Sequence, residues 1–179
     1  MSFLKAALAT AVVLGLVLVL GGILLPSTTR VERDAYIVSP PAEVFAVVDS
    51  LARFNEWSPW SGLDPDTVYT YSGPATGVGA SMNWVGDATV GSGSQKILES
   101  RPTSSVVTAI DFGASRATGT FALAGEGPGT RVRWSIASEH GYNLLQRWLG
   151  VLLLERMIGP DIELGLARLK LLMETPTQQ

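Results

Sequence analysis

The feature that most constrains this chain is a run near its amino terminus that carries no charge. From Ala6 to Leu25 there is no acidic or basic side chain. An α-helix rises about 1.5 Å per residue, so a helix of this length crosses the ~30 Å hydrocarbon core of a bilayer. We therefore predict a transmembrane helix that contacts the membrane through residues 3–25. Residues 1–29 would form the anchor and its linker, and residues 30–179 a separate folded domain.

A cleaved signal peptide is the alternative interpretation of this run. Lys5 followed by apolar residues resembles one, but the apolar core of a signal peptide is only about 7–15 residues long. The nearest approach to a small-x-small cleavage site, residues 20–22, is a poor match. An uncleaved, single-pass anchor in the cell membrane is therefore favoured. Lys5 on one side faces Arg30 and Arg33 on the other, so the positive-inside rule nearly ties; we favour the domain outside the cytoplasm.

Charge and cysteine content exclude several classes of function. The chain holds 13 basic and 16 acidic residues, a net charge of −3, and its arginines are scattered. Nucleic acid is therefore not an expected partner, because phosphate binding requires clustered Lys and Arg. With no cysteine, the chain has no disulfide framework, no thiolate nucleophile and no Cys-based zinc site.

Residues 66–139 alternate between polar and apolar side chains, which is typical of β-strands. The pattern is clearest at residues 130–137, where Arg131 and Arg133 alternate with Val132 and Trp134. Gly-rich breaks separate the weaker examples. The predicted strands are residues 31–38, 67–71, 78–85, 94–100, 106–112, 118–123 and 130–137.

Helical periodicity brackets these strands. Residues 39–54 are predicted to form one helix, and residues 142–154 begin another that is too short to span a bilayer. We expect Gly159-Pro160 to break the helix, which would begin again at the proline. Its apolar stripe would then consist of Ile162, Leu166, Leu169 and Met173.

Three segments resemble a known family: residues 41–45 (PAEVF), 57–60 (WSPW) and 159–170 (GPDIELGLARLK). They look like the polyketide cyclase/dehydrase and lipid-transport family of the START-like (SRPBCC) superfamily, over about residues 30–174. The resemblance implies an α+β helix-grip fold, in which a curved antiparallel sheet of about seven strands wraps a long C-terminal helix around a cavity. Members include lipid carriers, ligand receptors and a few cyclases. The N-terminal span resembles that of an anchored subgroup and argues against a freely diffusing carrier.

Trp57 and Trp60 bracket a Ser-Pro pair where a surface turn would normally be polar. In the helix-grip fold this segment folds back against the open side of the sheet, which implies that both rings plug or line the cavity. We expect Trp57 to be a core residue. For Trp60, a core position and a ligand contact stay equally open.

The predicted inward face is apolar and suits a lipid or another hydrophobic small molecule. The same side chains would look identical if they simply filled the core. The residues predicted to line the ligand site are Trp60, Met82, Trp84, Ile110, Phe112, Trp134, Leu152, Ile162 and Leu166.

No catalytic, metal or cofactor site is predicted. His140 is the only histidine, and beside Glu139 and Gly141 it is expected to be a solvated turn residue. A Ser-His-acid triad would need partners that no spacing provides, and metal-ligand spacing is missing. Asp111 alternates with Ile110 and is expected to face solvent.

Three functions stay open. The favoured one is a membrane-anchored domain that binds a lipid or hydrophobic small molecule, with residues 144–154 as a lid or entrance at the membrane. The second is a cyclase or dehydratase, for which Tyr71, Asn83 and Arg116 are unranked candidates. Such an enzyme would need an ionisable inward group, and the pattern provides none. The third is a ligand-free interaction domain of the cell envelope, which would need a solvent-exposed apolar patch on the outer sheet face or on the C-terminal helix. Residues 131–135 predict a polar outer face, which disfavours it.

Overall fold

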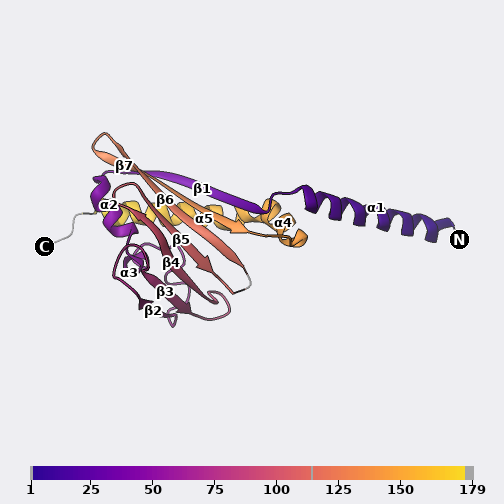
Figure 1. Cartoon of the computed structure of the whole chain (residues 1–179), viewed down its shortest axis with the longest axis horizontal. Helices are drawn as coiled ribbons and strands as arrows, with labels where there is room; N and C mark the ends of the chain where they lie inside the picture. Colours follow the sequence, from indigo (N-terminus) through magenta and orange to yellow (C-terminus); the bar gives the residue numbers. More distant parts are fainter. Residues whose placement is uncertain (1, 114, 176–179) are drawn as a thin grey trace.

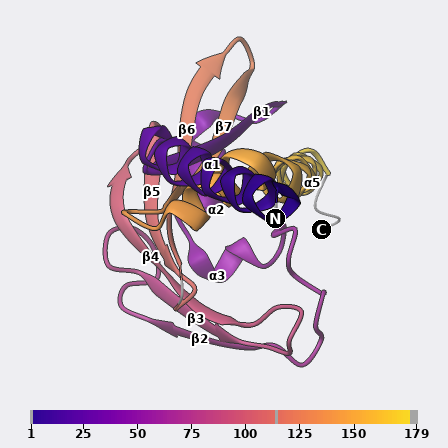
Figure 2. The same cartoon turned by 90° about the vertical axis from the view of Figure 1, so that its right-hand side faces the viewer.

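The computed structural model describes residues 2–113 and 115–175. Its N-terminal helix extends away from a domain in which one sheet curves around a long C-terminal helix (Figures 1 and 2). This arrangement confirms the predicted α+β helix-grip fold.

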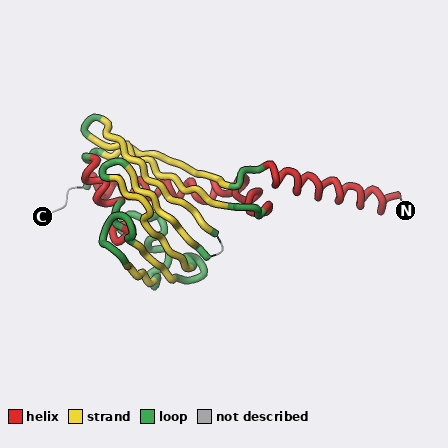
Figure 3. Tube along the Cα trace, viewed as in Figure 1, coloured by secondary structure: helices red, strands yellow, loops and turns green. Residues whose placement is uncertain are grey.

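All seven strands belong to one antiparallel sheet (Figure 3). The strand order is β1-β7-β6-β5-β4-β3-β2, so every pair except β1–β7 joins neighbours in sequence. The β1–β7 pairing brings Thr28 opposite Glu139, at the end of the sheet from which α1 leaves. The strands are β1 (Thr28–Ile37), β2 (Val68–Ser72), β3 (Ser81–Val85), β4 (Ser92–Arg101), β5 (Ser105–Asp111), β6 (Arg116–Glu126) and β7 (Gly129–Glu139).

The helices differ from the sequence prediction in two places. The single helix predicted over residues 39–54 is wrong, because the extended backbone of Ser50 separates α2 from α3. Serine favours helix caps over helix interiors, because its hydroxyl competes for backbone hydrogen bonds. The helical elements are α1 (Ser2–Leu24), α2 (Pro41–Val48), α3 (Leu51–Phe54), α4 (Leu144–Leu149), the π-helical turn η1 (Gly150–Leu154) and α5 (Glu155–Glu174).

The expected break at Gly159-Pro160 is also wrong, because α5 runs through both residues. A proline inside a helix removes one hydrogen bond and crowds the preceding turn. Most helical stability in proteins comes from tertiary packing. Helix α5 packs along β1 and buries its apolar stripe in the core. In that stripe Ile162, Leu166 and Leu169 are buried, as the periodicity indicated.

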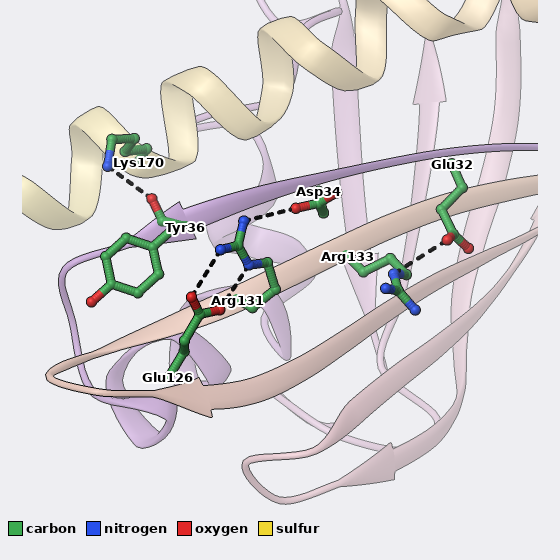
Figure 4. A network of polar contacts seen from close by, with 7 residues as sticks. All are labelled: Glu32, Asp34, Tyr36, Glu126, Arg131, Arg133 and Lys170. Carbon is green, nitrogen blue, oxygen red and sulfur yellow. Dashed lines mark hydrogen bonds and ion pairs between the residues drawn. The ribbon is translucent and has the colours of Figure 1, made fainter.

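The outer face of β1 and β7 is polar, as the alternation on β7 predicted. Arg131 donates hydrogen bonds to Glu126 and Asp34, and Arg133 forms an ion pair with Glu32 (Figure 4). The Arg131 guanidinium also lies 5.7 Å from the ring centroid of Tyr36. This surface therefore carries a network of paired charges.

Helix α1 extends away from the domain (Figure 1), and its apolar side chains are exposed along its length. Residues Phe3–Leu24 have a mean hydropathy of 2.6 and are long and apolar enough to cross a membrane. This test of length and composition is also passed by some signal sequences, which likewise lie near the amino terminus.

Candidate functional site

Aromatic side chains fill the space between the sheet and α5. Trp57 is 1% exposed, and its ring centroid lies 5.5 Å from that of Trp134 and 5.7 Å from that of Phe121. Phe54 and Trp60 complete the cluster, at 6.2 and 5.9 Å from Trp134. Trp57 is therefore a core residue, as expected, and aromatic rings fill the space between the sheet and α5.

Trp60 is held between this cluster and α5. Its indole Nε1 donates a hydrogen bond to Asp161 Oδ2 at 3.1 Å, and its ring is partly buried against the core. Asp161 directly follows Pro160, so the continuity of α5 decides where this acceptor lies. This hydrogen bond ties the segment after α3 to the C-terminal helix and accounts for the second tryptophan of the WSPW motif.

A pocket of about 210 Å³ opens at the α1 end of the domain, between the strand ends and the helical segment 144–157. Its helical wall is largely apolar, and the polar side chains come from the strand ends and from Gln146. It is somewhat smaller than the ~300–1,000 Å³ typical of ligand sites. We name it the His140 pocket; it is lined by Ser115, Ser138, His140, Gln146, Leu149, Gly150, Leu153, Leu154 and Met157.

His140 is buried in this pocket, so the expectation of a solvated turn residue is wrong. His140 is only 8% exposed. Its backbone N–H donates a hydrogen bond to Ser27 O at 2.8 Å, which continues the β1–β7 pairing beyond Glu139 and holds the residue against the sheet end. Side chains two residues apart on a strand share a face. Ser138 and His140 are four and six residues after the inward-facing Trp134, so the alternation predicts that both side chains face inward.

The environment of His140 favours its neutral form. Burial lowers the pKa of the imidazole, and the positive charge of Arg147 lowers it further. The Nε2 atom lies 3.0 Å from Thr29 Oγ1, within hydrogen-bond distance. A neutral imidazole can accept a proton or hydrogen-bond a polar group of a ligand.

The helical segment closes over His140 at the π-helical turn η1. Turns of this kind are frequent at functional sites, because they shift side chains relative to a regular helix. Here η1 carries Leu153 and Leu154 to the pocket wall. The local helix irregularity therefore coincides with the apolar side of the pocket.

A second pocket, of about 390 Å³, lies at the same end of the sheet on β3, β4 and β5. Trp84 and Phe112 meet there edge to face, with ring centroids 5.7 Å apart, and Phe112 is 49% exposed. We name it the Trp84 pocket; it is lined by Asn83, Trp84, Val85, Ser92, Gly93, Ser94, Asp111, Phe112 and Gly113.

The structure distributes the nine predicted ligand residues over three places. Trp84 and Phe112 share the Trp84 pocket, and Leu152 is exposed beside the His140 pocket without lining it. The other six are buried or partly buried in the core: Trp60, Met82, Ile110, Trp134, Ile162 and Leu166. Ligand contact by these residues stays a prediction, and none of the nine lines the His140 pocket.

Two of the polar candidates from the sequence, Tyr71 and Arg116, have side-chain partners. Asp111 accepts a hydrogen bond from the Gly113 N–H at 2.7 Å and pairs with Arg116, and these contacts lower the pKa of its exposed carboxyl. The Tyr71 hydroxyl accepts a hydrogen bond from Asn55. Within residues 2–113 and 115–175, no group of three or more His, Cys, Asp or Glu side chains lies close enough together to hold a metal ion.

Solved structures share this fold at low sequence identity. A Chromobacterium violaceum protein is 18% identical, with a TM-score of 0.54, over 84% of this chain and 100% of that one. A Nitrosospira multiformis protein is 14% identical, with a TM-score of 0.58, over 82% and 97%. The di-domain ARO/CYC BexL from the BE-7585A biosynthetic pathway is 16% identical, with a TM-score of 0.62, over 84% of this chain and 52% of its own.

At these identities, the structural likeness establishes the fold alone. A comparison with curated proteins gives no match. Residues 28–174, from the first strand to the end of α5, match the family model described as polyketide cyclase / dehydrase and lipid transport. The chain therefore belongs to the polyketide cyclase/dehydrase and lipid-transport family.

Proposed function

We propose that this protein is a membrane-anchored domain that binds a lipid or another apolar small molecule at the α1 end of its sheet. The observation that carries the proposal is the His140 pocket, whose helical wall is apolar and lies next to the end of α1. The polar end of a ligand would meet His140, Ser138 and Gln146, and its apolar part would lie along Leu149 and Leu153.

The division into an anchor (residues 1–29) and a binding domain (residues 30–179) belongs to this proposal, as does a domain outside the cytoplasm. Retention of α1 is supported by Arg147, which donates hydrogen bonds to carbonyl oxygens at the end of α1. Cleavage as a signal peptide would remove those acceptors. An uncleaved helix would hold both pockets close to the bilayer, the source of an apolar ligand.

The first test is mass spectrometry of the apolar molecules that co-purify with the full-length protein from its own membranes. We expect one lipid or isoprenoid class to be enriched over the bulk membrane extract. Leu153→Trp should deplete it, because the indole fills the His140 pocket. Leu171→Trp is the matched control, since Leu171 is exposed on α5 and does not line the pocket, and it should retain the ligand.

Absence of any enriched class in the wild type would contradict the proposal, as would equal depletion in both variants. Trp84→Ala provides the complementary measurement. Loss of the ligand in Trp84→Ala alone would place it in the Trp84 pocket and leave the His140 pocket without a role.

His140 favours a second candidate, an enzyme of the cyclase or dehydratase type. A neutral imidazole within a pocket is suited to general base catalysis, and Ser115 and Ser138 provide hydroxyl groups beside it. The test is incubation with a synthetic poly-β-ketone thioester, with cyclised and dehydrated products detected by mass. Turnover that His140→Gln abolishes would support the enzyme; turnover unchanged in that variant, or none above the uncatalysed rate, would exclude this role for His140.

A further inference from the structure

Arg147 joins α4 to the last turn of α1. Its Nη1 atom donates to the carbonyl oxygens of Gly22, Ile23 and Leu25, at 3.3, 3.1 and 3.2 Å. The final carbonyls of a helix lack intrahelical partners and form the negative end of its dipole. A single guanidinium therefore caps α1 from a helix that lies far away in the sequence.

Trp148 forms a second contact with α1. Its indole Nε1 donates to the carbonyl oxygen of Leu18 at 3.0 Å, and its ring lies against Gly21. A Cβ atom at Gly21 would sit 2.5 Å from the Trp148 ring, so any larger residue would displace it. Glycine at a helix interface allows this close approach. Arg147 and Trp148, which we call the α4 clamp, thus hold α4 beside the end of α1. Figure 1 shows the two helices next to each other at this end of the domain.

The face of the helical segment that the α4 clamp leaves free is apolar and exposed. Tyr142, Leu145, Leu149 and Leu152 recur at helical spacing, and Tyr142, Leu145 and Leu152 are 96%, 67% and 58% exposed. Between Tyr142 and Leu154 the only charged residue is Arg147, and its guanidinium donates hydrogen bonds to backbone carbonyl oxygens. Water is a poor environment for such a surface.

We propose that this apolar face, residues 142–152, lies in the headgroup and upper acyl region of the same bilayer that α1 crosses. The proposal rests on α1 being a retained membrane anchor. The α4 clamp contacts carbonyls from Leu18 to Leu25, where a span that begins near residue 3 would leave the hydrocarbon. Amphipathic helices with Trp, Tyr and Arg are typical of this layer. The domain is then held in one orientation, with the His140 pocket at the membrane surface.

The experiment uses the full-length protein in liposomes of phosphatidylcholine and phosphatidylglycerol. Because the chain has no cysteine, single-cysteine variants can carry an environment-sensitive fluorophore at one chosen site. Leu145→Cys and Leu152→Cys test the apolar face, and Leu14→Cys reports on α1. Leu171→Cys is the matched control, an equally exposed leucine at the far end of α5. Quenching by lipids with a doxyl group near the headgroup is measured at each site.

We expect loss of most of the fluorescence at positions 145 and 152 and none at position 171. Position 14 lies near the middle of the span, so it is measured with lipids that carry the doxyl group deep in the acyl chain. Deep quenching at position 14 with no shallow quenching at 145 and 152 would overturn this inference and leave the anchor intact. No deep quenching at position 14 would instead overturn the anchor, and the inference with it. Arg147→Gln combined with Trp148→Ala should reduce quenching at position 152; unchanged quenching would show that the α4 clamp does not hold the face there.

Discussion

Gly150 lies directly against the imidazole of His140. A Cβ atom on Gly150 would sit 2.2 Å from His140 Nε2 and 2.8 Å from Thr29 Oγ1, closer than side-chain atoms approach one another. The glycine therefore lets the helical segment close over His140 and form the wall of the pocket. Neither residue is a neighbour of the other in sequence, and the contact exists only in the folded domain.

Gly150→Ala is expected to destabilise the domain by forcing the imidazole away from Thr29. Overpacking costs about 1–3 kcal/mol, whereas alanine gains at most about 1 kcal/mol over glycine in a helix. The net change should lower the melting temperature measured by tryptophan fluorescence. Combining Gly150→Ala with His140→Ala should remove most of this cost, because the ring that the methyl group meets is gone. An equal cost in both backgrounds would place the clash elsewhere.

Stability should fall as the pH is lowered through a window set by His140. Its pKa is lowered in the folded state, so below about pH 6.5, the usual histidine value, the unfolded chain binds a proton more readily than the folded one. This contribution to stability is complete above that value and is lost as the pH falls toward the folded-state pKa. Melting temperatures measured from about pH 7.5 to about pH 5 should reveal it.

His140→Gln is the control for that measurement, because His140 is the only histidine. The variant should show a flat profile in the same range. Asp111 and Glu126, whose pKa values are lowered by hydrogen bonds from Gly113 and Arg131 respectively, lose their contribution only at lower pH. A slope near pH 6 that survives in His140→Gln would contradict the assignment.

The hydrogen bond between Trp60 and Asp161 should be measurable by a double-mutant cycle. Trp60→Phe keeps an aromatic ring in the cluster but removes the indole donor, and Asp161→Ala removes the acceptor. We expect a coupling free energy of about 1 kcal/mol, the usual size for one partly exposed hydrogen bond. The coupling free energy is obtained from thermal or denaturant unfolding of the wild type, the two single variants and the double variant. If the two single changes in unfolding free energy simply add in the double variant, the hydrogen bond contributes nothing to stability.

Arg131 and Arg133 provide a matched pair for the outer-face network. Arg131 contacts Glu126, Asp34 and the Tyr36 ring, whereas Arg133 pairs with Glu32. Arg131→Gln should therefore lower the melting temperature more than Arg133→Gln. In about 1 M salt, where the Debye length is about 3 Å, the difference should shrink. A difference that persists would point to the stacking on Tyr36 rather than to charge pairing.

The wrong predictions for Pro160 and His140 have the same physical cause. A proline breaks an isolated helix, but α5 continues through Pro160 because its stripe of Ile162, Leu166 and Leu169 is buried in the core. A lone histidine after a strand is usually solvated, but the backbone pairing of His140 with Ser27 and the cover from Gly150 bury it. In each case a contact between segments far apart in sequence outweighs the local preference.

The amino-acid sequence by itself determined the apolar α1 helix, the inward and outward faces of the strands and the apolar stripe of α5. These features follow from periodicity and composition, which act over a few neighbouring residues. Only the tertiary structure decided which inward side chains are packed and which line a pocket. Trp134 and Phe112 follow the same inward pattern, yet the aromatic cluster covers Trp134, and Phe112 stays 49% exposed near the sheet end. The reason is that sheet curvature and helix docking determine coverage, and both depend on contacts across the whole chain.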